Sequence, residues 1–234
     1  MKSSKFPVTL LHLKFNNMGG VYSKGTAPGE ICYDISKGDL DGSKDKPPKG
    51  ATTLRLVNPK GVTKMPGIRH LEHITRVIVD DSYRACTSVG NDFLRHCSSL
   101  NFVKLDGLSS CTRIGNFFLY WCSSLQSVKL DALSNCTRVG DSFLCRCSSL
   151  ESVKFDGLRN CTRVGNDFLC GCRSLQTVTF DGLSNCINVG DSFLCRCTSL
   201  QSVELNGLSN CIKVGNWFLE GCSALRQIVV VDNT

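Results

Sequence analysis

The chain has 234 residues, of which 41% are hydrophobic and 20% are charged, and its formal net charge is +7. These values are close to the globular average and exclude a disordered chain, while the lack of any run of about 20 apolar residues excludes a transmembrane helix. The 16 cysteines are too sparse for a small disulfide-stapled scaffold and need another explanation.

Residues 1–50 are expected to form an irregular N-terminal cap or linker segment, because glycine and proline interrupt them repeatedly. Within this segment, Leu10–Phe15 and Glu30–Ile35 are predicted to be strands of the cap. Lys37–Lys49 is charged and rich in glycine and proline, which predicts a mobile loop or linker. Residues 1–80 carry 13 basic and 7 acidic side chains, so most of the positive charge lies toward the N-terminus.

The first residues do not match a secretory signal, because Pro7, His12 and Lys14 interrupt the apolar stretch Phe6–Phe15. No acidic residue precedes Glu30, which leaves a mitochondrial presequence as an alternative. We therefore expect a cytoplasmic protein with reduced thiols, and mitochondrial and cell-surface locations are the alternatives.

Residues 51–234 are predicted to form one repetitive unit. Thr53–Leu56 is expected to be a degenerate early strand, and Ile74–Asp80 the first strand of the regular repeats, which span about residues 74–230. One glycine and two cysteine positions recur every 25 residues without a slip, which is typical of a solenoid. They are Gly90, Gly115, Gly140, Gly165, Gly190 and Gly215; Cys86, Cys111, Cys136, Cys161, Cys186 and Cys211; and Cys97, Cys122, Cys147, Cys172, Cys197 and Cys222.

One repeat, residues 125–149, indicates the structure of the rest. Leu125-Gln-Ser-Val-Lys-Leu130 has the alternation of a short strand, and Gly140 marks a turn. Asp141–Cys147 begins with a capping residue and places Phe143 four residues before Cys147, which predicts a single helical turn. Strands that recur in this way must be parallel, with neighbouring repeats about 4.8 Å apart.

The repeat resembles the leucine-rich repeat, and specifically its BspA-like, Treponema-type branch, as found in unicellular eukaryotes. Val139-Gly140, then Phe143, then Cys147-Ser-Ser-Leu150 follow the order of that branch, although the 25-residue unit is longer and Leu133 replaces an expected Asn or Cys. The resemblance implies an α/β leucine-rich-repeat solenoid with short parallel strands, short helical or irregular returns and an irregular N-terminal cap.

The twelve periodic cysteines are interpreted as two core ladders of small buried side chains, because one cysteine per layer does not give the four convergent ligands of a zinc site. Cys145, Cys170 and Cys195 each form a C-x-C pair with Cys147, Cys172 or Cys197 of the second cysteine ladder, which we call the inner ladder. These three cysteines are expected to be partly exposed, as a stripe that could oxidise or bind a soft metal. We expect no structural metal and no cofactor.

Catalysis is not indicated. The four histidines, at positions 12, 70, 73 and 96, lie in no recognisable Ser/His/Asp or Cys/His arrangement, and His70–His73 is expected to be a solvated loop or cap. Asp106, Asp131 and their equivalents recur once per layer, as strand-end turn residues do. No catalytic residue is therefore predicted.

Surface positions indicate protein binding. Phe117, Tyr120 and Trp121 replace mostly polar residues of other repeats, Trp217 occupies the Phe117 position further along, and Lys104, Lys129 and Lys154 align on the strand face. We predict that these seven residues contact a protein partner, with the aromatic ones forming a patch on the convex side. Cover of the aromatics by the N-terminal segment is the structural alternative.

These features together predict a non-catalytic protein–protein interaction scaffold. The alternatives are a cell-surface adhesin, and a basic subunit of a ribonucleoprotein or organellar assembly that uses the N-terminal segment. The latter makes nucleic acid a second possible partner. No membrane span is expected.

Overall fold

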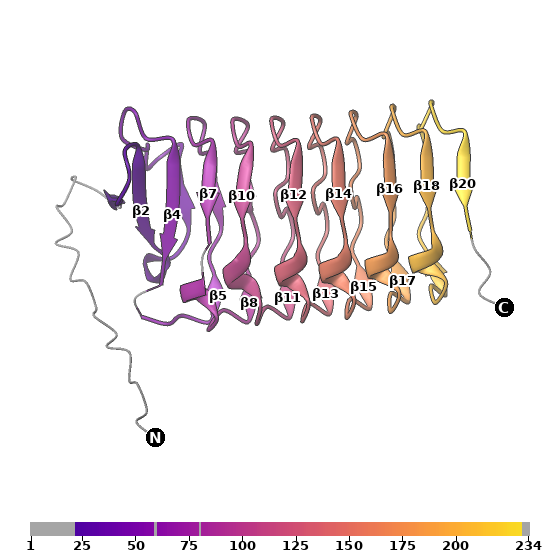
Figure 1. Cartoon of the computed structure of the whole chain (residues 1–234), viewed down its shortest axis with the longest axis horizontal. Helices are drawn as coiled ribbons and strands as arrows, with labels where there is room; N and C mark the ends of the chain where they lie inside the picture. Colours follow the sequence, from indigo (N-terminus) through magenta and orange to yellow (C-terminus); the bar gives the residue numbers. More distant parts are fainter. Residues whose placement is uncertain (1–21, 59, 80, 231–234) are drawn as a thin grey trace, which may run out of the picture.

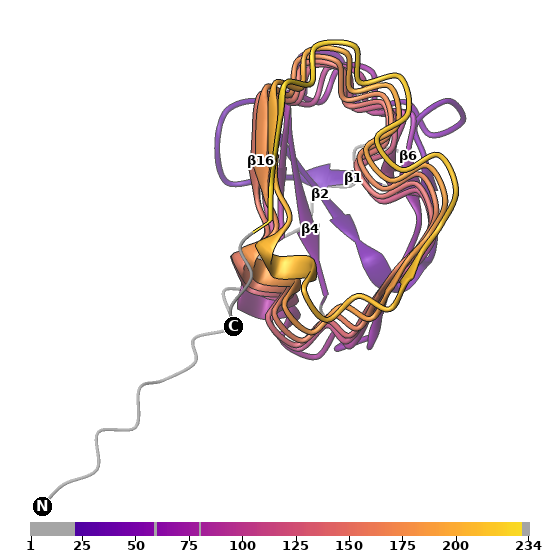
Figure 2. The same ribbon diagram turned by 90° about the vertical axis from the view of Figure 1, so that its right-hand side faces the viewer.

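The computed structural model describes residues 22–58, 60–79 and 81–230. Each 25-residue repeat makes one coil, and the coils stack side by side along the long axis of the molecule (Figure 1). Viewed along that axis, successive coils superpose as a ring around a common interior (Figure 2). The predicted solenoid of short parallel strands is thus confirmed.

The first row of strands forms what we call the strand side. Its members are parallel, except that β1 (Tyr22–Lys24) runs antiparallel to β2 at the N-terminal edge. Val128 pairs with Val153 and Val203 with Ile228, so the register follows the 25-residue period. The other strands of this row are β2 (Glu30–Asp34), β4 (Thr53–Val57), β7 (Arg76–Ile78), β10 (Phe102–Lys104), β12 (Ser127–Lys129), β14 (Ser152–Lys154), β16 (Thr177–Thr179), β18 (Ser202–Glu204) and β20 (Gln227–Val229).

Two further rows of short strands complete the ring. The second row is a seven-stranded parallel sheet, and the third has three strands near the N-terminus. The second row comprises β5 (Lys64–Met65), β8 (Ser88–Val89), β11 (Arg113–Ile114), β13 (Arg138–Val139), β15 (Arg163–Val164), β17 (Asn188–Val189) and β19 (Lys213–Val214). The third row comprises β3 (Leu40–Asp41), β6 (Ile68–Arg69) and β9 (Phe93–Arg95).

Over the described residues, the helical content is limited to single 3₁₀ turns. Most of them follow directly after a strand of the strand side, so the predicted helical turn at Asp141–Cys147 is wrong in position. The turns are η1 (Ile35–Lys37), η2 (Asp81–Tyr83), η3 (Asp106–Leu108), η4 (Asp131–Leu133), η5 (Asp156–Leu158), η6 (Asp181–Leu183) and η7 (Asn206–Leu208).

The segment predicted to be helical instead has a backbone in which alternate residues are left-handed. Ser142, Leu144 and Arg146 have φ values of 59°, 53° and 61°. The N–H of Leu144 donates back to the Phe118 carbonyl at 2.9 Å, whereas the N–H of Arg146 donates forward to the Cys170 carbonyl at 2.7 Å. A helix would bond these groups within the segment, so the bonds between coils replace it. We call residues 92–96, 117–121, 142–146, 167–171, 192–196 and 217–221 the turn segments.

Side chains from the turn segments supply the centre of the core. Phe93, Phe118, Phe143, Phe168 and Phe193 are fully buried, and each ring stacks on the next with centroids 5.0–5.4 Å apart. The cysteine ladders are confirmed as core positions, because ten of their twelve members are buried and the other two, Cys211 and Cys222, lie half-buried in the last coil.

The N-terminal residues join the same rows. The predicted strand at Glu30–Ile35 is confirmed as β2. The predicted strand Thr53–Leu56 lies within β4, and Ile74–Asp80 contains β7. The prediction of a mobile loop or linker is wrong for part of Lys37–Lys49, since Leu40 is fully buried in β3, which pairs with β6. The predicted strand Leu10–Phe15 lies outside the described residues, and the domain boundary after residue 50 stays a prediction.

Candidate partner-binding surface

The predicted aromatic residues come from one turn segment, and they form one cluster. The Phe117 and Tyr120 rings meet edge to face with centroids 5.5 Å apart, and the Tyr120 and Trp121 rings meet at 6.1 Å. Trp121 is 41% exposed, while Phe117 and Tyr120 are half-buried. We call these three residues the aromatic patch.

The backbone holds the aromatic patch between its neighbouring coils. Phe117 and Trp121 have φ values of 61° and 57°, and their N–H groups donate to the carbonyls of Asp141 and Cys145 at 2.8 and 2.9 Å. These main-chain bonds fix the backbone at both ends of the segment, and with it the points from which the rings extend. The patch is thus carried on a backbone that its neighbouring coils hold in place.

Two arginines from the adjacent coils flank the rings. The Arg95 guanidinium lies 4.6 Å from the Phe117 ring centroid and 5.5 Å from that of Tyr120, and the Arg146 guanidinium lies 5.0 Å from the Trp121 ring. Arg95 also pairs with Asp92 at 2.8 Å. Cation–π contacts of this kind orient the rings and add positive charge beside them.

Two histidines extend the aromatic patch over three coils, and the sequence interpretation missed them. The His70 and His96 rings stack with centroids 5.1 Å apart, and His96 lies 5.3 Å from Trp121. Burial, with a smaller contribution from Arg95, lowers the pKa of His96 below its usual value. The sequence did contain a signal for His96, because this residue occupies the same repeat position as Trp121, one repeat earlier. His70 therefore belongs to this surface rather than to the predicted solvated loop.

Trp217 does not join the aromatic patch. It is 59% exposed and lies four coils further along, a separation of about 19 Å at the usual strand spacing. In the last described coil it accompanies the exposed side chains of Ile212, Val214 and Ile228. The last described coils therefore expose several apolar side chains.

The lysine column also lies apart from the aromatic patch. Lys104, Lys129 and Lys154 are exposed on β10, β12 and β14. Figure 2 shows the strand side, marked by β16, across the ring from β6, whose row leads into the turn segments. The Lys104 ammonium pairs with the Asp106 carboxylate at 3.2 Å, so the neighbouring Asp column partly neutralises the lysines.

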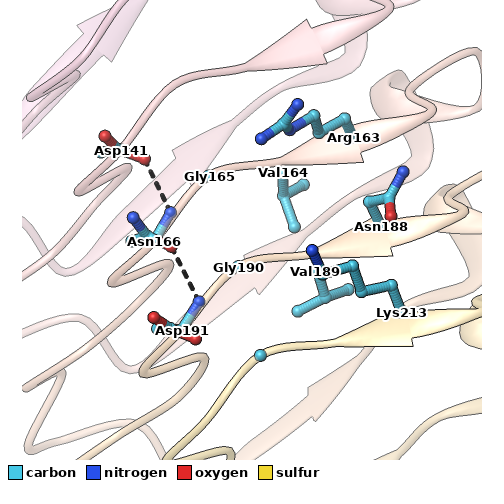
Figure 3. A pocket seen from close by; sticks show the side chains of 11 residues that line it. Asp141, Arg163, Val164, Gly165, Asn166, Asn188, Val189, Gly190, Asp191 and Lys213 are labelled. Carbon is cyan, nitrogen blue, oxygen red and sulfur yellow. Dashed lines mark hydrogen bonds between the residues drawn. The ribbon is translucent and has the colours of Figure 1, made fainter.

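A groove of about 240 Å³ runs along the second row of strands (Figure 3). Its floor is formed by glycines, since a Cβ on Gly190 would lie 2.5 Å from the Gly165 carbonyl carbon. One wall carries Asp141, whose carboxylate accepts from the Asn166 N–H at 2.8 Å, and the Asn166 amide oxygen accepts from the Asp191 N–H at 2.9 Å. These polar side chains are thus occupied in joining coils.

The cysteine stripe differs from its prediction. Cys145 and Cys195 are only 4% and 8% exposed, and Cys170 alone is half-buried, because the neighbouring turn segments cover the other two. Among residues 22–58, 60–79 and 81–230, no group of three histidine, cysteine or acidic side chains is placed to hold a metal ion. In the same ranges, no helix is long and apolar enough to cross a membrane.

This chain is similar to known leucine-rich-repeat proteins in sequence and in structure. The BspA type leucine rich repeat region matches residues 72–183 and 158–234, in six copies. A leucine-rich repeat protein from Bacteroides ovatus is 14% identical over 88% of this chain and 68% of its own, with a TM-score of 0.48. The T. pallidum Leucine Rich Repeat protein is 16% identical over 88% of each chain, with a TM-score of 0.35.

A leucine rich cell surface protein from Faecalibacterium prausnitzii is 14% identical over 79% of this chain and 74% of its own, with a TM-score of 0.31. No curated protein matches the sequence. The repeat-family match covers most of the chain and agrees with the motif and the coils. The protein belongs to the BspA-type leucine-rich-repeat family.

Proposed function

We propose that this repeat scaffold is non-catalytic and binds a protein partner through the aromatic patch. The observation that carries the proposal is the exposed Trp121 ring, held beside Phe117 and Tyr120 by main-chain bonds and two arginines. The equivalent positions in other coils mostly carry aspartate, serine, arginine, cysteine or glycine.

The chemistry of the aromatic patch favours a protein partner. Tryptophan, tyrosine and arginine are the residues most enriched among those that dominate the energy of protein interfaces. Because neighbouring coils hold the backbone of the patch in place, little backbone conformational entropy is lost when a partner binds. His70 and His96 add a half-buried aromatic margin on the side of the earlier coils.

The remaining predicted contacts define a larger footprint. Trp217 is reached only by a partner that extends about 19 Å along the axis from Phe117. Lys104, Lys129 and Lys154 are reached only by a partner that also contacts the strand side. We therefore place the aromatic patch at the centre of the proposed interface and these four residues at separate contacts.

The test is affinity capture with two triple variants. Phe117→Ala/Tyr120→Ala/Trp121→Ala should abolish capture of the partner, since single interface hot spots typically contribute at least about 2 kcal/mol. The matched control, Lys104→Ala/Lys129→Ala/Lys154→Ala, should retain it. Circular dichroism and thermal unfolding would verify that both variants are folded. Unchanged capture by the aromatic variant would refute the proposed patch.

The same experiment discriminates the alternatives. A nucleic-acid partner would be favoured by binding that falls steeply with salt and is lost when residues 1–50 are deleted, provided that circular dichroism shows the shortened chain to be folded, because these residues include β2 and the buried Leu40. Glycans mapped on Asn135 or Asn160, which lie in Asn-Cys-Thr sequons, would favour a cell-surface adhesin.

A further inference from the structure

Cys145, Cys170 and Cys195, which we call the thiol stripe, occupy the same position in three successive turn segments. The N–H of Arg146 donates to the Cys170 carbonyl and the N–H of Gly171 to the Cys195 carbonyl, both at 2.7 Å, so main-chain bonds join the three segments. Neighbouring strands lie about 4.8 Å apart, within the Cα separation of about 4.4–6.8 Å that a disulfide spans. The stripe thus meets the spacing needed for a disulfide between coils.

The thiol stripe differs from the two cysteine ladders in its hydrogen bonds. The Cys147 and Cys172 thiols of the inner ladder donate to the carbonyls of Leu119 and Leu144 at 3.0 and 3.1 Å, and burial raises their pKa. The Cys170 thiol instead interacts with the thiols of Cys145 and Cys195. Donation by Cys145 stabilises the thiolate form of Cys170.

Three arginines surround the exposed side of Cys170. Cys170 lines a cavity of about 260 Å³ together with Trp121, Arg146, Arg173 and Arg196, and the described part of the chain contributes no acidic side chain to that lining. The hydrogen bond from Cys145, with smaller contributions from a hydrogen bond with Cys195 and the charge of Arg196, lowers the pKa of Cys170 to about 7, although burial and the Asp167 carboxylate oppose this. The hydrogen bond with Cys170 and burial raise the pKa of Cys145. Cys170 is therefore the accessible, nucleophilic member of the stripe.

We propose that Cys170 is a peroxide-sensitive thiol, and that Cys145 converts its oxidised form to a disulfide between adjacent coils. The Cys170 thiolate attacks one oxygen of a hydroperoxide, ROOH; the S–O bond forms, the O–O bond breaks, and the leaving alkoxide takes a proton to become ROH. The Cys145 sulfur then attacks the resulting sulfenic acid; the S–S bond forms, the S–O bond breaks, and hydroxide leaves with the Cys145 proton as water. Two thiols are oxidised and one peroxide is reduced.

The expected rate advantage is moderate. A pKa near 7 rather than 9 raises the thiolate fraction at pH 7 about 50-fold, while the weaker intrinsic nucleophilicity costs about 10-fold. Cys170 should thus react about 5-fold faster than an ordinary free thiol, and far faster than the buried ladder thiols. The inference does not depend on partner binding by the aromatic patch.

The test exposes the full reduced chain to increasing hydrogen peroxide, blocks free thiols by alkylation, and identifies linked peptides by mass spectrometry without reductant. The Cys145–Cys170 disulfide should appear first. Cys170→Ser should abolish it, and Cys145→Ser should leave a Cys170 sulfenic acid that dimedone traps. The matched control, Cys195→Ser, changes the same position one coil on and should preserve the disulfide.

A second measurement needs no variant. Iodoacetamide should alkylate Cys170 before any of the ten buried ladder cysteines of the native protein, with a rate that rises through about pH 7. Cys170 reacting no faster than Cys136 or Cys172 would overturn the proposal. So would a disulfide that persists in Cys170→Ser, or a Cys170–Cys195 disulfide as the main product.

Discussion

The strand side and the turn segments each recur once per coil, but they are built on different backbones. On the strand side, residues such as Ser152–Lys154 form ordinary parallel strands with serine and lysine outward and valine inward. In the turn segments, non-glycine residues such as Leu144 and Arg146 adopt left-handed conformations. The comparison shows that each 25-residue coil concentrates its unfavourable left-handed backbone conformations on one side.

The free-energy cost of the left-handed conformations is offset by the apolar side chains that the same side of the coil buries. The turn segments provide the stacked phenylalanines, and the inner cysteine ladder follows directly after them. On the strand side, each of β7, β10, β12, β14, β16 and β18 has one buried valine at its centre. Phe117 and Trp121 of the aromatic patch also lie at left-handed positions. Core and candidate surface thus share one segment, so substitutions there should have the largest effects.

The largest predicted effect is the loss of a central ring. Phe168→Ala removes a fully buried side chain that contacts Phe143, Phe155 and Phe193, and should cost about 4 kcal/mol of unfolding free energy. Val153→Ala, the strand-side comparison, should cost about 2 kcal/mol, because fewer methyl groups leave the core. Urea denaturation monitored by circular dichroism gives both values, and equal costs would contradict the contrast between the sides.

Replacement of serine by glycine should change the stability by an intermediate amount, and in opposite directions in the turn segments and on the strand side. Ser192 has a φ of 59° in a turn segment, so Ser192→Gly should relieve strain and stabilise the protein by about 0.5–1 kcal/mol. Ser202 lies in β18, where the same change, Ser202→Gly, should destabilise it by a similar amount. Thermal melting of the two variants checks the prediction, and shifts in the same direction would disprove it.

The smallest effect concerns pH. Burial, with Arg95 and His70 nearby, lowers the pKa of His96 in the folded protein, although Asp92 opposes this. Below about pH 6.5 the unfolded chain therefore binds more protons at this residue than the folded chain does, and stability falls as the pH decreases. Urea midpoints between pH 8 and 5 should decline less in His96→Gln than in the original protein. His73→Gln, at an exposed position, should retain the original slope.

The sequence predicted the coils because the core positions repeat with a constant period. Val128, Cys136, Phe143 and Cys147 each identify an inward ladder, and the structure confirms them as buried. The turn segments were not predicted correctly, because leucine and arginine at positions 144 and 146 carry no preference for left-handed backbone. Only Gly171 and Gly221, which replace Arg146 in other coils, indicated a positive φ there.

The candidate surface was predictable only in part, for a related reason. Replacement of polar residues by Phe117, Tyr120 and Trp121 stands out when the repeats are aligned, and the structure brings these rings together. The contribution of His70 could not be inferred, since it depends on ring stacking across coils rather than on residue type. Burial of Cys145 by its neighbours likewise depends on three-dimensional contacts.

The glycine floor of the groove has a consequence for how this scaffold can change. Gly165, Gly190 and Gly215 let the main chains of successive coils touch, so backbone contact, and not side chains, sets the distance from coil to coil. Replacing an outward residue on one coil then leaves the positions on all other coils unchanged. A recognition surface on this protein can therefore change by substitutions in one coil at a time. An inserted coil would displace the later coils along the axis by one coil-to-coil distance.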